Sequence, residues 1–429
     1  MSDFHSNLKV LAVAHNPFST YQNMGKTLVS MFSDFDRTEL CQLYIYPTVP
    51  DSDKATSYYR ITDKDVLRSY YKFRVDGKVI TPTPDMHAMF ENADDEALYR
   101  NRKNKKPLRM LLRDLMWKLA PWYNKGLRTW IEEQAPSCIF VAPGTAKFIY
   151  DIAFKISKAY KLPIVSYICD DYYFVKSRKG ILARLEQSTL KKKIKALIKK
   201  SAHVITICDE LKEAYSAEFN VPVTTVMTGS SYSLAEQPKK VDEPKAITYM
   251  GNIRCNRYHS LAEIGRTLDE INLEKGTSYE LRIYTAEKDA EILSSFAGIK
   301  SVKLCGFVSG EEFKEVFYSS DILLHTEGHD EASVDLVKHS VSTKIADSLA
   351  SGIPFFAYGP DCVASVKHLL KNDCAIVATS GEELREKLLE AFENAELREA
   401  KCKNALECAK AYHDGEAVAK KIRGIFEEI

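Results

Sequence analysis

Residues 339–354 read His-Ser-Val-Ser-Thr-Lys-Ile-Ala-Asp-Ser-Leu-Ala-Ser-Gly-Ile-Pro, which predicts a loop, a helix and a turn into a strand. Ser342 or Thr343 is expected to cap the helix, because a side-chain oxygen accepts one of the N–H groups left over there. Gly352 is expected to end the helix in the left-handed conformation, and Pro354 prevents its continuation.

The start of this helix is a candidate site for an anion. The N–H groups of its first turn and the charge of Lys344 both attract a phosphate group. Asp347 follows Thr343 by four residues and therefore lies on the same face of the helix. A phosphate at the helix start with a sugar hydroxyl at Asp347 is geometrically possible. The alternative is a capped helix with a solvated lysine and aspartate.

The run from Lys344 to Pro354 resembles the donor-binding segment of family 4 glycosyltransferases, which reads Lys-aliphatic-X-acid-X-Leu-Ala-X-Gly-X-Pro. The resemblance implies a retaining enzyme with the GT-B fold, in which two Rossmann-like domains face each other across a cleft. It also implies that the helix start holds the donor diphosphate and that Asp347 holds the ribose hydroxyls. Much of the family has a second acid eight residues earlier, facing the donor sugar. This chain departs from that pattern, with His339 at the position.

A second donor-binding element is expected after the strand 246–250. Gly251 ends this strand and would let a phosphate approach the backbone, and two arginines beyond it could pair with the phosphate. The resemblance implies a basic residue of this loop on the diphosphate, and Arg257 is preferred to Arg254. Two solvated arginines are the alternative. The expected donor-binding residues are Gly251, Arg254, Arg257, Ser342, Thr343, Lys344 and Asp347.

The acceptor is expected in the first half of the chain. His15 follows the buried-strand pattern 8–14, and the resemblance places the loop after it, with Gly25 and Lys26, beside the acceptor. Ligands bind where strands of open α/β sheets end. Paired carboxylates, Asp170 and Asp171, end the strand 164–169. An ordinary strand-end histidine and a solvated turn are the alternatives. The candidate catalytic residues are His15, Asp170, Asp171 and His339.

Composition limits the remaining choices. A chain of 429 residues, 45% hydrophobic and 28% charged, indicates a soluble protein of two domains. Its ten cysteines include no CxxC pair, and the spacing of Cys402 and Cys408 matches no metal motif, so neither metal nor cofactor is expected. The N-terminus does not read as a signal peptide, and no apolar run is long enough to span a membrane. A cytoplasmic location is therefore predicted.

Charge is distributed unevenly. Residues 101–200 hold 23 Lys and Arg against 7 Asp and Glu, which indicates an anionic partner. Residues 176–200 combine many lysines with an apolar stripe, and the helical pattern 107–119 is also basic. Anionic lipid is the expected partner, since no nucleic-acid signature accompanies the charge. Peripheral attachment to the inner face of the membrane would then involve Trp117, Trp122, Trp130 and the lysines of 191–200.

The predicted architecture is α/β. Residues 1–235 form a Rossmann-like acceptor-binding domain with an irregular insert at about 50–106. Residues 236–410 form a Rossmann-like nucleotide-sugar-binding domain, and 411–429 form a helix that crosses back to the first domain. Asp209 is expected to cap the helix 210–219.

These features predict a glycosyltransferase that moves a sugar from a nucleotide sugar to a glycan or a polyprenyl-linked acceptor in surface polysaccharide synthesis, with retention. No nucleic acid is expected as a partner. One alternative is a nucleotide-sugar 2-epimerase, which shares the fold but does not need the basic face. Another is a binding subunit without catalysis, which His339 in place of an acid would suit.

Overall fold

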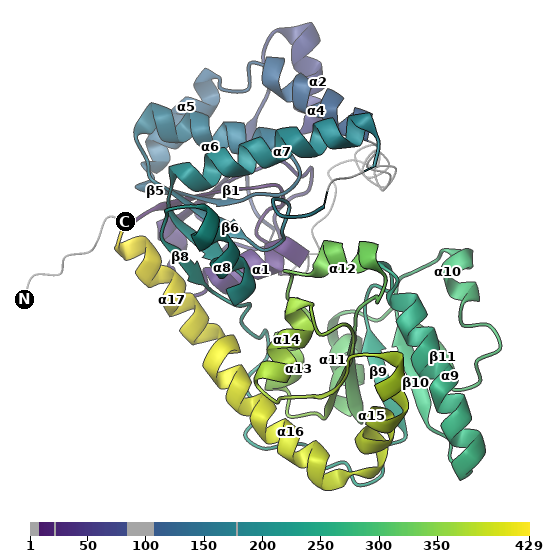
Figure 1. The fold of residues 1–429 in the computed structure, drawn as a ribbon. Helices are drawn as coiled ribbons and strands as arrows, with labels where there is room; N and C mark the ends of the chain where they lie inside the picture. The colour runs from purple at the N-terminus through teal and green to yellow at the C-terminus, as the bar shows by residue number, and fades with distance from the viewer. Residues whose placement is uncertain (1–7, 21–22, 84–106, 177–178) are drawn as a thin grey trace, which may run out of the picture. The chain divides into compact units, whose positions relative to one another are not determined.

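The computed structural model describes residues 8–20, 23–83, 107–176 and 179–429 and contains two compact units (Figure 1). The first unit comprises Met1–Thr228 and Gly415–Ile429, and the second comprises Gly229–Asp414. Each is an α/β unit around one largely parallel sheet, as the sequence predicted. Among the helices of the described residues, none is long and apolar enough to cross a bilayer.

The first unit is built on an eight-stranded sheet of order β4-β3-β2-β1-β5-β6-β7-β8. Neighbouring strands run parallel except for the pair β3 and β4. The central strands are buried along their whole length, which explains their continuous apolar sequences. The strands are β1 (Val10–Ala14), β2 (Leu40–Tyr44), β3 (Ser57–Arg60), β4 (Lys78–Ile80), β5 (Cys138–Ala142), β6 (Ile164–Ile168), β7 (Ser201–Thr206) and β8 (Val223–Thr225).

The described part of the expected insert is regular, so the prediction of an irregular segment is wrong there. It supplies β3, the helix α2 (Asp63–Lys72) and β4, which extend one edge of the sheet. Helix α2 begins with a capping box: the Thr62 side chain accepts from the Asp65 N–H, and the Asp65 carboxylate accepts from the Thr62 N–H. Residues 84–106 of the insert lie outside the described chain.

The helices of the first unit pack around this sheet, and all three tryptophans belong to its interior. Trp117, Trp122 and Trp130 are 0%, 9% and 3% exposed. The prediction that they take part in membrane attachment is therefore wrong. The N-cap of α8 is Cys208 rather than Asp209. The helices are α1 (Asn23–Met31), η1 (Arg37–Glu39), α2, α4 (Pro107–Leu119), α5 (Lys125–Gln134), α6 (Lys147–Tyr160), α7 (Ile181–Lys200), α8 (Asp209–Glu218) and α17 (Gly415–Glu427).

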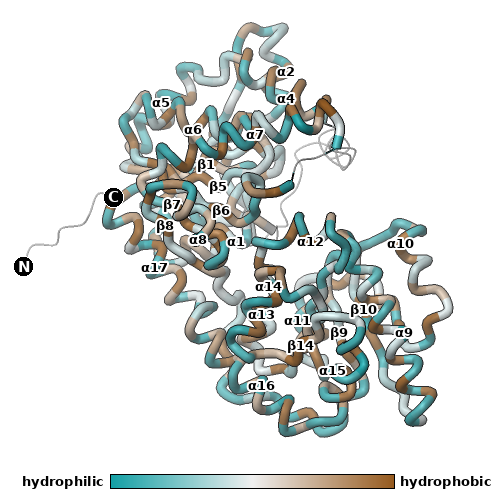
Figure 2. Tube along the Cα trace, in the orientation of Figure 1, coloured by the Kyte–Doolittle hydropathy of each residue, from teal (hydrophilic) through white to brown (hydrophobic). Residues whose placement is uncertain are grey.

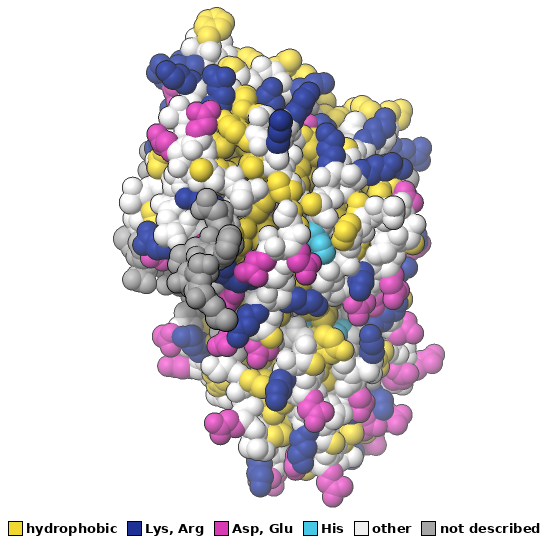
Figure 3. Space-filling view, turned by 90° about the vertical axis from the view of Figure 1, so that its left-hand side faces the viewer, with side chains coloured by type: hydrophobic (Ala, Val, Ile, Leu, Met, Phe, Trp, Pro, Cys, Tyr) yellow, Lys and Arg dark blue, Asp and Glu magenta, His cyan; other side chains and the backbone are white. Residues whose placement is uncertain are grey.

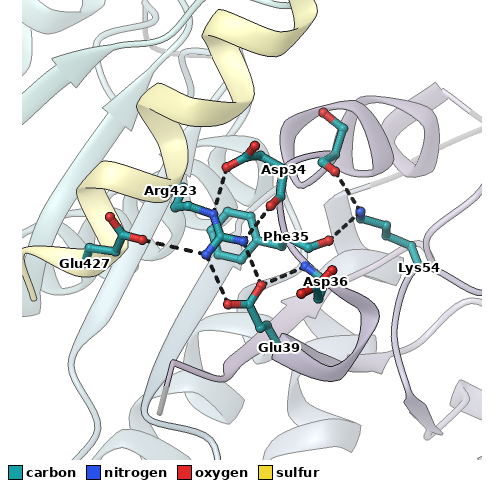
Figure 4. A network of polar contacts seen from close by, with 8 residues as sticks. Asp34, Phe35, Asp36, Glu39, Lys54, Arg423 and Glu427 are labelled. Carbon is teal, nitrogen blue, oxygen red and sulfur yellow. Dashed lines mark hydrogen bonds and ion pairs between the residues drawn. The ribbon is translucent and has the colours of Figure 1, made fainter. Parts of the chain in front are cut away.

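The C-terminal helix α17 belongs to the first unit, which confirms the predicted return of the chain. Its apolar face joins the core under the sheet through Val418, Ile422, Ile425 and Phe426. Arg423 anchors its polar side: the guanidinium donates to Asp34 and, through two nitrogens, to Glu39 at 2.7–3.0 Å (Figure 4). The same guanidinium lies over the Phe35 ring, 4.5 Å from its centroid.

The second unit has a six-stranded parallel sheet of order β11-β10-β9-β12-β13-β14. This is the strand order of a Rossmann fold. Figure 2 shows teal and brown residues alternating along the helices of this unit, α16 among them. The strands are β9 (Ala246–Met250), β10 (Glu280–Tyr284), β11 (Val302–Gly306), β12 (Ile322–Thr326), β13 (Phe355–Tyr358) and β14 (Ile376–Ala378). The helices are α9 (Arg257–Lys275), α10 (Ala290–Ser294), α11 (Gly310–Ser319), α12 (Glu331–Val337), α13 (Thr343–Ala350), α14 (Ala364–Lys371), α15 (Gly381–Glu393), α16 (Ala395–Cys408) and the π-helical turn η3 (Ala409–His413).

Helix α13 is the helix predicted from the opening stretch. Gly352 follows it with φ of +70°, which confirms the left-handed ending. Ser342 is the N-cap residue, but its side chain accepts no capping hydrogen bond, so the predicted side-chain cap is not formed. Instead the Ser342 N–H donates to the Ser365 hydroxyl at 3.1 Å, which ties the helix start to α14.

Candidate functional site

The candidate site lies at the reversal of strand order in the second sheet. Strands β9 and β12 are neighbours there, and the chain continues from them in opposite directions across the sheet. Ligands of open α/β sheets bind at such a point, beyond the carboxyl ends of the strands. A cavity of about 180 Å³ occupies this place and is lined by Tyr249, Asn252, Arg257, Leu324, His325, Ser342, Lys344, Ile345, Ser348 and Phe355.

Lys344 crosses this cavity from the first turn of α13 to the end of β9. Its ammonium donates a hydrogen bond to the Met250 carbonyl and lies 5.5 Å from the centroid of the Tyr249 ring. A Cβ atom at Gly251 would lie 1.6 Å from the Lys344 Nζ, and the φ of Gly251 is +153°. Glycine is therefore required at 251 for both reasons, backbone conformation and the place of the lysine.

Arg257 is the second cation of the cavity and the first residue of α9. Its Nε and one terminal nitrogen donate to the same oxygen of Glu327, at 2.8 and 2.7 Å. The other oxygen of Glu327 lies 3.3 Å from the His325 Nε2. Glu327 follows β12 and is 2% exposed, so a buried carboxylate fixes the arginine from behind.

The charges of these groups depend on one another. Burial alone raises the pKa of Glu327, but hydrogen bonds and charges from His325 and Arg257 hold that pKa below its usual value. The surrounding protein partly desolvates Lys344, and this effect, together with the smaller effect of the Arg257 charge, lowers the pKa of Lys344 to about 8. The charge of Glu327 partly opposes this shift. As a residue, Lys344 is exposed to solvent. An anion placed between the two cations would relieve their repulsion.

Two helices begin at this cavity. The start of α13 contributes Ser342, Lys344 and Ile345, and the start of α9 contributes Arg257. The loop before α9 turns sharply, because Cys255 and Asn256 have φ of 58° and 55°. The Asn256 amide holds this turn by donating to Asp330 at 2.6 Å. Two helix N-termini with a lysine and an arginine form a strong anion site.

The structure therefore separates the predicted donor-binding residues into two groups. Arg257, Ser342 and Lys344 line the cavity, and Gly251 makes room for Lys344. Arg254 is directed to Glu287 instead, at 2.6 Å, and is exposed. Thr343, Asp347 and His339 do not line the cavity as the described chain forms it.

Asp347 forms hydrogen bonds within the second unit. One of its oxygens accepts from the Ser231 N–H at 2.7 Å and from the Ser230 hydroxyl at 3.2 Å. The carboxylate thereby holds the segment with which the chain enters the second unit, which begins at Gly229. A role for Asp347 with a ribose stays a prediction, as does a role for His339 with the donor sugar.

In the first unit, His15 lies where β1 ends and contacts a charged cluster. Its Nε2 is 3.2 Å from a terminal nitrogen of Arg113. Arg113 in turn pairs with buried Asp63, which also accepts from the Trp117 indole at 2.6 Å. The strands β1 and β5 at this edge are again the point of reversal in strand order. His15 is thus an oriented histidine at the carboxyl end of β1, the place where open α/β sheets generally bind ligands.

The other acceptor-side candidates differ in environment. Asp171 is 6% exposed and accepts from the backbone N–H groups of Tyr173 and Phe174, which is a turn-forming role. Asp170 is exposed and accepts from the Tyr172 hydroxyl at 3.2 Å. Gly25 permits close packing of α1, since its Cβ would lie 2.5 Å from the Pro17 oxygen. Lys26 is exposed, and roles for all four in catalysis or acceptor binding stay predictions.

Sequence reasoning missed several residues of both sites. Tyr249 and His325 lie inside buried, largely apolar strands, which gave no signal for a site, and Glu327 was not among the candidates. The position of Glu327, directly after a buried strand, was the available signal. In the first unit, Asp63 lies in the supposed insert, and Arg113 lies on the basic helix 107–119, whose charge was interpreted as a surface for lipid.

Comparison with known proteins supports this architecture. Residues 265–424 match the family described as Glycosyl transferase-like. No curated protein sequence matches the chain. Solved structures with a similar fold include HepE of Anabaena, in complex with UDP and glucose, with a TM-score of 0.65 and 11% identity over 98% of this chain and 100% of that one.

Two further structures are similar over nearly the full length. Sucrose-phosphate synthase from Thermosynechococcus elongatus has a TM-score of 0.61 and 10% identity and covers 98% of both chains. The alpha,alpha-trehalose-phosphate synthase (UDP-forming) from Burkholderia xenovorans, in complex with glucose-6-phosphate, has a TM-score of 0.59 and 8% identity over 98% of this chain and 100% of that one. At such identities the likeness concerns the fold, which is GT-B.

Proposed function

We propose that this protein is a glycosyltransferase that uses a nucleoside diphosphate sugar and binds its diphosphate in the cavity of the second unit. The observation that carries the proposal is the convergence of Lys344, Arg257 and the N-termini of α9 and α13 on one cavity. Preorganised cations and N–H dipoles stabilise the charge that develops on a leaving diphosphate. The match to the glycosyl transferase-like family and the UDP complex of HepE support the same reading.

Binding of free nucleotides tests this proposal directly. Lys344→Ala should weaken the binding of UDP, GDP or ADP, whichever the wild-type protein binds, by about 1.5–3 kcal/mol, the range of charge-assisted hydrogen bonds. Lys338→Ala is the matched control, because Lys338 is an exposed lysine nearby that does not line the cavity. Calorimetry that finds equal affinities in the two variants and the wild type would exclude this site.

Transfer itself is tested with a panel of nucleotide sugars. A glycosyltransferase should hydrolyse its own donor slowly without an acceptor, whereas an epimerase would release the altered sugar and a binding subunit would do neither. The resemblance to family 4 enzymes supports retention as part of this proposal. The anomeric proton signal of the product, read by NMR, decides between retention and inversion.

The acceptor in this proposal is a glycan carried by a polyprenyl phosphate or a related surface polymer, presented at an anionic membrane. Helix α4 supports this with four leucines, 108, 112, 115 and 119, that are each more than half exposed and fall on one face. Arg109 and Lys118 on the same helix are exposed too. Figure 3 shows Lys and Arg side chains spread over the first unit at the top of that view.

The lysine run of α7 contributes less than expected. Lys193 pairs with Asp151, Lys195 lies 3.6 Å from Glu218, and Lys191 donates to the Val175 carbonyl. These contacts occupy charges that the sequence analysis assigned to lipid. The leucine face of α4, with its flanking cations, is therefore the surface to test.

Vesicle sedimentation tests this attachment. The variant with Leu112, Leu115 and Leu119 changed to Gln should lose binding to anionic vesicles, because each leucine contributes up to about 1.5–3 kcal/mol on burial. The matched control changes Leu273, Leu304 and Leu336, exposed leucines of the second unit, to Gln. If both variants sediment like the wild type, the α4 face does not bind lipid.

A further inference from the structure

A cluster of histidine and cysteine side chains lies inside the second unit and is not part of the proposed diphosphate cavity. His368 comes from α14, Cys408 ends α16, and His413 ends the π-helical turn η3. Their Nε2 and Sγ atoms all lie within 4.8 Å of one another. We propose that His368, Cys408 and His413 bind one zinc ion.

The distances fit a tetrahedral zinc site. The Nε2 atoms of His368 and His413 are 3.0 Å apart, and the Cys408 Sγ is 3.4 Å from the His368 Nε2. With zinc bonds of about 2.0–2.1 Å to nitrogen and about 2.3 Å to sulfur, tetrahedral geometry places two nitrogens about 3.3 Å apart and nitrogen and sulfur about 3.5 Å apart. Shifts of a few tenths of an ångström would therefore admit the ion.

Local backbone geometry brings two of these ligands together. Cys408 and His413 are five residues apart, so in an ordinary α-helix they would point in different directions. The turn Ala409–His413 is π-helical, and its i→i+5 pattern returns residues five apart to one face. Such turns occur frequently at functional sites, where an inserted residue re-aims a side chain.

The surroundings suit a structural ion. All three side chains are buried: Cys408 is 4% exposed, His368 9% and His413 1%. Nitrogen and thiolate ligands of this kind favour zinc over magnesium or calcium. The fourth position falls to a water molecule, because the buried Cys374 lies outside the cluster and donates its thiol to the Leu369 carbonyl at 3.6 Å.

The site would fix the end of the second unit. The His413 carbonyl accepts from the Ser230 N–H at 2.8 Å, so the segments entering and leaving this unit lie side by side. The unit ends at Asp414, one residue after His413. A zinc ion would clamp this exit onto α14 and leave the diphosphate cavity free.

Metal analysis of the untagged, full-length protein tests the proposal. After dialysis against metal-free buffer, elemental analysis should find about one zinc per chain, falling below about a tenth in Cys408→Ala and in His413→Ala. Cys402→Ala is the matched control, because Cys402 is equally buried on the same helix and lies outside the cluster. It should keep the metal.

A second measurement uses the wild-type protein, so it tests the proposal even if the variants fail to fold. Cobalt added to metal-stripped wild-type protein should give a thiolate-to-metal charge-transfer band that saturates at one equivalent, and zinc should raise its melting temperature. Wild-type protein without stoichiometric zinc, without this band and without stabilisation by zinc would show that the three side chains form only a buried hydrogen-bond network. Nucleotide binding is measured independently, so failure of the zinc site leaves the proposed function standing.

Discussion

At the scale of single residues, the charge of Lys344 is sensitive to its surroundings. With its pKa lowered to about 8, the ammonium is half charged near pH 8 and loses its charge as the pH rises further. A bound anion favours the charged form, so the pKa rises in the complex. Affinity for a nucleoside diphosphate should therefore fall about twofold between pH 7 and 8 and more steeply above, approaching tenfold per pH unit.

Calorimetry at pH 7, 8 and 9 measures this dependence. Lys344→Met keeps the length of the side chain without its charge, so its weaker binding should vary little over the same range. A wild-type affinity that stays constant to pH 9 would contradict a lowered pKa of Lys344 at the anion site.

Gly251 gives a second prediction at this scale. Gly251→Ala would push its methyl group into the Lys344 ammonium and impose a strained φ of +153°. Binding of nucleoside diphosphate should weaken about as much as in Lys344→Ala, with a stability loss of about 1–3 kcal/mol. The measurements are calorimetry and chemical denaturation.

The matched control is Gly276→Ala. Gly276 has φ of +68° with open space around its Cβ, so it carries backbone strain without any contact to the site. It should lose stability and keep nucleotide affinity. Equal affinities in the two alanine variants would contradict the role given to Gly251.

At the scale of secondary-structure elements, the attachment of α17 depends on Arg423. This side chain is 22% exposed and forms ion pairs with Asp34 and Glu39. Burial alone would raise the pKa of Glu39, but the hydrogen bond and charge of Arg423 lower it. Arg423→Ala should cost about 2–4 kcal/mol, between the values for surface and buried ion pairs. Urea denaturation measures it, and the exposed Lys420→Ala on the same helix is the control.

The sign of the pH effect follows from the carboxylate. A lowered pKa of Glu39 in the folded state stabilises the protein above the ordinary pKa of a glutamate, and this stabilisation is lost as the pH falls. The wild-type protein and Arg423→Ala should therefore become more similar in stability in acid. A difference that grows on acidification would contradict the pairing.

At the scale of the whole molecule, the two units differ in how they are built from the chain. The second unit is continuous, Gly229–Asp414, whereas the first needs residues 415–429. The core of the first unit includes Val418, Ile422, Ile425 and Phe426. Removing four such side chains costs about 1.5–3 kcal/mol each, which approaches the whole stability of a domain.

Two fragments test this organisation. Residues 229–414 alone should unfold cooperatively and bind the same nucleotide as the full chain, whereas residues 1–228 should fold only when a peptide of residues 415–429 is added. Circular dichroism and calorimetry measure both. A fragment 1–228 that is as stable as the first unit in the full chain would contradict the contribution of α17.

The sequence by itself determined most of the elements and their order, apart from β3, α2 and β4 in the supposed insert. The strands were evident because buried parallel strands are apolar throughout, and the end of α13 was evident because Gly352 and Pro354 act on their immediate neighbours. The choice of Lys344 as a cavity residue also came from local signals, since a helix start attracts anions wherever it lies.

Only the tertiary structure decided which residues share a site. Arg257 lines the cavity and Arg254 does not, because Glu327 and Glu287, distant in sequence, each hold one of them. The tryptophans are buried and the leucines of α4 are exposed, because the packing of neighbouring elements determines which face of a helix is covered. The His368, Cys408 and His413 cluster matches no spacing motif, since packing and a π-turn assemble it. Periodicity reports contacts within an element, whereas contacts between elements depend on how the chain packs.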